Sequence, residues 1–80
     1  MTKMEDLQTL TDLLSKRGIE GKFQTMILST VQAKRVRTEE SIPMLIEALK
    51  TKELPTATHV LGEAYEISVK CGFVPLKVYH

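Results

Sequence analysis

The sequence is poor in several residue types, and each shortage excludes a class of protein. Its 80 residues include one cysteine and no tryptophan. The single cysteine, Cys71, cannot form an internal disulfide, and no cysteine or histidine spacing typical of a zinc site is present. A chain without disulfides is typical of a reducing compartment, so we expect a cytoplasmic protein. We also expect no metal and no cofactor.

Long apolar runs and an excess of one charge are also missing. The longest uninterrupted apolar runs are a few residues, too short for a membrane span or for the apolar region of a signal peptide. The formal net charge is +1, so the chain has no strong field toward nucleic acid or an anionic membrane. Hydrophobic residues make up 42% of the chain and charged residues 26%, which is typical of a folded globular domain.

The hydrophobic periodicity predicts an all-α fold. Apolar residues recur at intervals of three and four through most of the chain. We expect one compact helical domain over residues 1–80, with four helices at roughly 3–17, 21–36, 41–50 and 56–71 and an extended apolar C-terminal tail. Gly18 and Gly72 are each placed to end a helix in the left-handed conformation, with an apolar residue directly after.

The second and fourth helices have well-defined apolar sides. On the second, the inward stripe includes Met26. On the fourth, small residues occupy the middle of the apolar side, and bulkier ones flank them. The small residues are Ala57, Ala64, Ser68 and Cys71, and the bulkier ones are Leu61, Tyr65, Val60 and Ile67. Small residues let a second helix approach closely. The third helix, at about ten residues, is expected to be too short to cover its longer neighbours.

The basic residues Lys34, Arg35 and Arg37 are expected to be exposed together at the C-terminal end of the second helix, where its last turn leaves the core. They could contact phosphates, with the third helix entering a groove of nucleic acid. They could instead complement the dipole of the second helix, because they lie at its C-terminus. Glu39 and Glu40 would repel phosphates at the start of the third helix, which favours the second interpretation. A small nucleic-acid-binding transcriptional regulator that uses Lys34, Arg35 and Arg37 is therefore the alternative hypothesis.

His59 is the centre of a third hypothesis. His59, Glu63 and Glu66 share the polar side of the fourth helix and could supply metal ligands in a bundle, although such pairs are also ordinary surface chemistry. The run His59-Val60-Leu61-Gly62 resembles the His-x-Leu-Lys-Gly stretch of histidine phosphotransfer domains, which are four-helix bundles. Here the lysine is missing and the glycine comes one residue early. The resemblance implies a histidine phosphotransfer module, and the carboxylates a metal-binding one.

The sequence contains no pattern typical of an enzyme. It has no glycine-rich phosphate loop, no Ser-His-Asp order and no paired carboxylates. Cys71 has no general base at a diagnostic spacing, and a lone cysteine is usually a small buried apolar residue. We therefore expect a protein without catalytic residues.

Several apolar residues have no place on a predicted core face, and we predict that they contact a partner: Leu28, Met44, Val74, Leu76, Val78 and Tyr79. The tail could instead cover the open end of the bundle, and Leu28 and Met44 could be scattered surface residues. A homodimer would bury the same patch twice. The sequence thus favours a small non-enzymatic interaction or regulatory protein that binds a protein partner or associates with itself, with no membrane involved.

Overall fold

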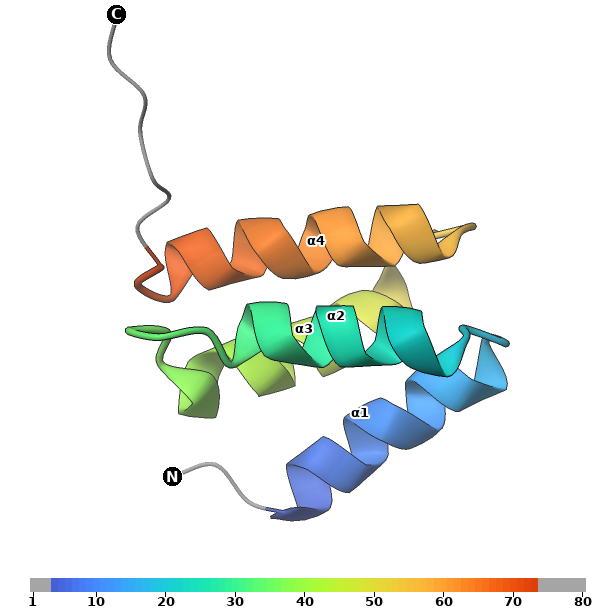
Figure 1. The fold of residues 1–80 in the computed structure, drawn as a ribbon, viewed down its shortest axis with the longest axis horizontal. Coiled ribbons are helices and arrows are strands. Elements are labelled where there is room, and N and C mark those ends of the chain that lie inside the picture. Colours follow the sequence, from blue (N-terminus) through green and yellow to red (C-terminus); the bar gives the residue numbers. More distant parts are fainter. Residues whose placement is uncertain (1–3, 74–80) are drawn as a thin grey trace, which may run out of the picture.

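The computed structural model describes residues 4–73, with side chains from Asp6 onward, and it confirms the all-α fold (Figure 1). The chain forms four helices, α1 (Met4–Lys16), α2 (Gly21–Val31), α3 (Thr38–Thr51) and α4 (Ala57–Lys70). None of the four combines the length and the apolar character that a membrane span requires. The predicted tail, from Val74 onward, lies outside the described residues.

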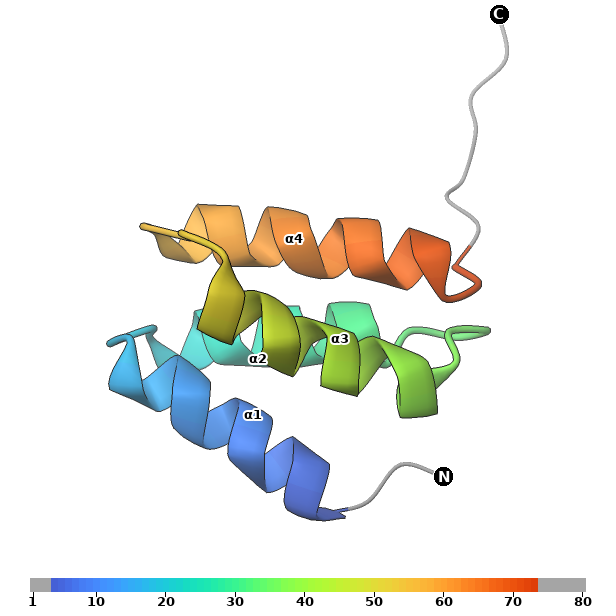
Figure 2. The same cartoon turned by 180° about the vertical axis from the view of Figure 1, so that it is seen from behind.

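The helices enclose one core. α2 and α3 lie in the middle of the domain, with α4 on one side of them and α1 on the other (Figures 1 and 2). α2 and α4 run side by side in the same direction, and α3 runs in the opposite direction to both. All four helices contribute fully buried apolar side chains, among them Leu10, Leu14, Ile27, Val31, Ile42, Leu45, Val60 and Ala64.

α2 is shorter than predicted, because it ends at Val31 rather than near residue 36. In a longer helix, the carbonyl of Val31 would accept the amide of Arg35. Here the buried hydroxyl of Ser41 donates to that carbonyl at 2.7 Å. Arg35 itself has a φ of 75°, a left-handed conformation in which an L-residue does not continue a helix. The chain therefore leaves α2 in a turn.

α3 is longer than predicted, with 14 residues instead of about ten. Because proline has no amide to donate, Pro43 favours a helix that starts shortly before it, as in the predicted range 41–50. The first turn forms ahead of it all the same, since the carbonyl of Arg37 accepts the amides of Glu40 and Ser41 at 2.9 Å each. α3 therefore equals α4 in length. The expectation that the third helix is too short to cover its neighbours is wrong.

The glycine residues end helices as predicted. Gly18 follows α1 with a φ of 75°, and the amide of Ile19 donates to the carbonyl five residues earlier at 3.2 Å. Gly72 follows α4 with a φ of 119°, and the equivalent bond from Phe73 measures 2.9 Å. Both ends are Schellman motifs, which satisfy carbonyls that have no partner within the helix.

Two arginine side chains cap helices other than their own. The guanidinium of Arg17 donates to the carbonyls of Leu49 and Leu54, the latter at 3.1 Å, where α3 ends. The guanidinium of Arg37 donates to the carbonyl of Lys70 at 3.3 Å, at the last residue of α4. Cations at helix C-termini also interact favourably with the helix dipole. Each arginine therefore links the connecting segment in which it lies to the end of a helix that is distant in sequence.

The small residues of α4 are buried against α2, as the sequence predicts. Ala64 and Ser68 are both fully buried. The Ser68 hydroxyl lies 2.6 Å from the carbonyl of Thr30 on α2 and 2.8 Å from the carbonyl of Ala64. A hydroxyl group that reaches the backbone of a neighbouring helix requires the two helices to lie close together.

This contact predicts the effect of a larger side chain. Ala64→Leu should overpack the α2–α4 contact and lower the free energy of unfolding by about 1–3 kcal/mol. Glu66→Leu, at an exposed position of the same helix, should change it by less than about 0.5 kcal/mol. Urea denaturation of both variants measures the difference. Equal losses would show that a different face of α4 is buried.

The conformation of Gly72 supports a second prediction. A Cβ atom at this position would lie 2.5 Å from the backbone oxygen of Arg35, and a φ of 119° is strained for any L-residue. Gly72→Ala should therefore destabilise the fold by roughly 2 kcal/mol or more. Gly62→Ala is the matched control, because Gly62 is exposed within α4 and a Cβ there would meet nothing within 4 Å. It should stabilise by about 0.5–1 kcal/mol. Similar thermal midpoints for the two variants would contradict the described junction.

Candidate interaction surface

A hollow of about 240 Å³ lies between α2 and α4. We call it the α2–α4 groove. Its lining is Ser29, Thr30 and Ala33 from α2, Tyr65 from α4, and Phe73, which follows α4. The rings of Tyr65 and Phe73 meet edge to face, with 5.9 Å between their centroids. The Thr30 hydroxyl donates to the carbonyl of Met26, so the lining is largely apolar.

Large apolar side chains are exposed beside the groove. Met26 is 49% exposed, Tyr65 45% and Val69 40%. Met26 lies one turn before Thr30 on α2, and Val69 lies one turn after Tyr65 on α4, so all three share this face. Within residues 6–73, the only other exposed large apolar side chain is Met44, on α3. Apolar surface that gathers on one face of a small protein is typical of an interaction site.

Charged side chains are exposed at both ends of α2. Glu20 stands immediately before α2 and is exposed. Lys34 and Arg35 follow α2, in the turn that leads to α3, and are also exposed. Lys22, exposed one turn before Met26, adds a positive charge at the same end as Glu20, so that end carries charges of both signs.

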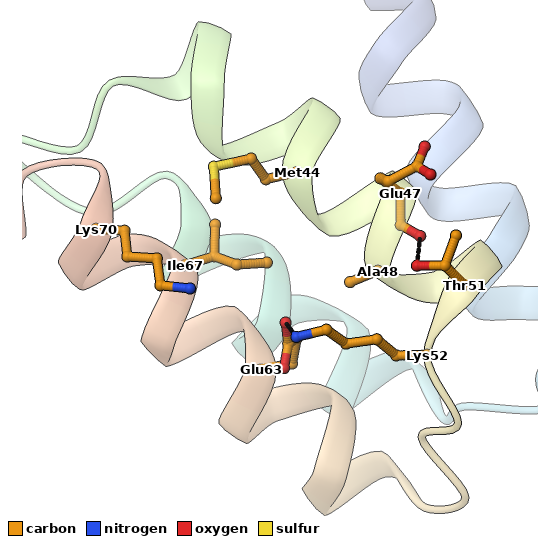
Figure 3. A pocket seen from close by; sticks show the side chains of 8 residues that line it. All are labelled: Met44, Glu47, Ala48, Thr51, Lys52, Glu63, Ile67 and Lys70. Carbon is orange, nitrogen blue, oxygen red and sulfur yellow. Dashed lines mark hydrogen bonds and ion pairs between the residues drawn. The ribbon is translucent and has the colours of Figure 1, made fainter.

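A second hollow, of about 220 Å³, lies on the other side of α4, against α3 (Figure 3). Lys52 and Glu63 form an ion pair at its edge, with 2.8 Å between Nζ and Oε2. The hydrogen bond to Glu63 and the negative charge of its carboxylate raise the pKa of Lys52 above its ordinary value. Glu47 and Lys70 also line this hollow. A charged rim makes it a less suitable site for an apolar partner than the α2–α4 groove.

The predicted partner-binding residues fall in different places. Met44 lines the α3–α4 hollow, is 38% exposed, and has its sulfur 3.6 Å from that of Cys71. Leu28 is half-buried and packs against the core, so it is not the exposed residue that the sequence indicated. The remaining four lie outside the described residues: Val74, Leu76, Val78 and Tyr79.

The sequence did not identify the exposed residues of the α2–α4 groove. Met26 and Tyr65 both lie on the apolar sides of their helices, a position that predicts burial in the core. Periodicity identifies the apolar side of a helix but not how much of that side its neighbours cover. The small residues of α4 were the available signal. Where a helix packs through small side chains, the large ones beside them are left at the edge of the contact.

The basic residues of the alternative hypothesis do not act as one group. Lys34 and Arg35 are exposed in the turn after α2. Arg37 forms an ion pair with Glu40, at 2.9 Å between Nε and Oε2, and also caps α4. All three cations are exposed, but Arg37 is already paired, and the group stands next to the acidic first turn of α3. Phosphate binding gains no support from this arrangement.

His59 takes part in a helix cap. The side chain of Thr56 accepts the backbone amide of His59 at 3.3 Å, and Nδ1 of the imidazole lies 2.7 Å from the Thr56 hydroxyl. Glu63 pairs with Lys52, on another helix. In the part of the chain that the structure describes, no three histidine, cysteine or acidic side chains gather where they could hold a metal ion. His59, Glu63 and Glu66 are thus not brought together as ligands.

The buried polar groups of the described domain are hydrogen-bonded, and its one cysteine is buried. Every buried side-chain nitrogen and oxygen in residues 6–73 has a hydrogen-bond partner. Cys71 is 1% exposed. Burial raises the pKa of its thiol, and the charge of Glu40 adds to this increase, while Arg37 and Lys70 oppose it. The thiol is therefore neutral near pH 7 and shielded from solvent, the opposite of an activated nucleophile.

Comparisons of the chain with family models, with curated proteins and with solved structures find no match. The contacts, burial and charges of the described residues are therefore the basis for a functional assignment.

The raised pKa of Cys71 predicts a pH dependence of stability. In the unfolded chain the thiol ionises near its ordinary pKa of about 8.5. The pKa of the Cys71 thiol is higher in the folded state than in the unfolded chain. Its contribution to the free energy of unfolding is therefore fully present below pH 8, and it is lost as the pH rises through the pKa of the folded state. The decline should not exceed about 1.4 kcal/mol per pH unit. Denaturation between pH 7 and 10 should show this decline in the native protein but not in Cys71→Ala. The same slope in both would contradict the assignment.

Proposed function

We propose that this chain is a non-enzymatic interaction protein that docks a protein partner in the α2–α4 groove. The observation that carries the proposal is the gathering of Met26, Tyr65 and Val69 on one face, beside an open apolar hollow. Burying such side chains gains about 25 cal/mol for each Å² of apolar area removed from water. Tyrosine suits this role because its ring is large and loses little freedom on binding.

The rigidity of the site supports a docking role. Tyr65 directly follows Ala64 on α4 and lies about one turn before Ser68, where α4 packs against α2. Phe73 is held by the Schellman motif at the end of α4. A groove built from two packed helices is largely formed before the partner arrives, which lowers the entropic cost of binding.

Photo-crosslinking in the native cells tests the proposal. A benzophenone amino acid replaces Tyr65 in one variant and Met44, in the α3–α4 hollow, in a control variant. We expect protein adducts from position 65 that survive nuclease treatment, and few or none from position 44. Mass spectrometry then identifies the crosslinked chain.

Each other outcome counts against the proposal. Adducts from position 44 alone would move the surface to the α3–α4 hollow. Adducts to nucleic acid alone would favour the alternative hypothesis of a nucleic-acid-binding regulator. The absence of adducts at both positions would reject a docking role for the groove.

A further inference from the structure

We draw no further inference here: the strongest candidate, the α2–α4 groove with the exposed side chains of Met26, Tyr65 and Val69 beside it, belongs to the site already described, and nothing in the structure shows what covers it.

Discussion

The close contact between α2 and α4 is the constraint on which the rest of this structure depends. Ser68 and Ala64 are small enough for the backbones to approach, and the Ser68 hydroxyl reaches the carbonyl of Thr30 across the contact. Leucine at these positions would hold the helices apart. Because the middle of the contact is occupied by small groups, the larger Tyr65 and Val69 lie at its edge and are partly exposed. The packing that stabilises the domain also creates its apolar face.

The turn between α2 and α3 joins this contact to the rest of the chain. Ser41 donates to the last carbonyl of α2, and the Arg37 amide donates to the carbonyl of Cys71 at 2.9 Å. The turn therefore lies against the end of α4, where Gly72 allows the backbones to come close. Phe73 follows directly, so the same junction positions one wall of the groove.

Much of this fold could be predicted from local patterns. The number of helices, the glycine stops and the small buried residues of α4 all follow from spacing within one segment. The end of α2 could not be predicted, because it depends on Ser41, which is ten residues away in sequence. The early start of α3 depends on bonds to the Arg37 carbonyl ahead of a proline. The exposure of Met26 and Tyr65 depends on how far neighbouring helices extend around each apolar side, which no single segment encodes.

The helix caps formed by Arg17 and Arg37 show which positions matter most when the sequences of distant relatives are compared with this one. Two N–H groups of the Arg17 fork meet two carbonyls, and the Arg37 fork meets one carbonyl and a carboxylate. Lysine has one ammonium group on a flexible stem and cannot reproduce that geometry, so an exchange of arginine for lysine is not conservative at either site. Chains that have diverged beyond detectable overall similarity, yet keep arginine at these two interhelical junctions, are the ones in which this helix arrangement is expected to persist.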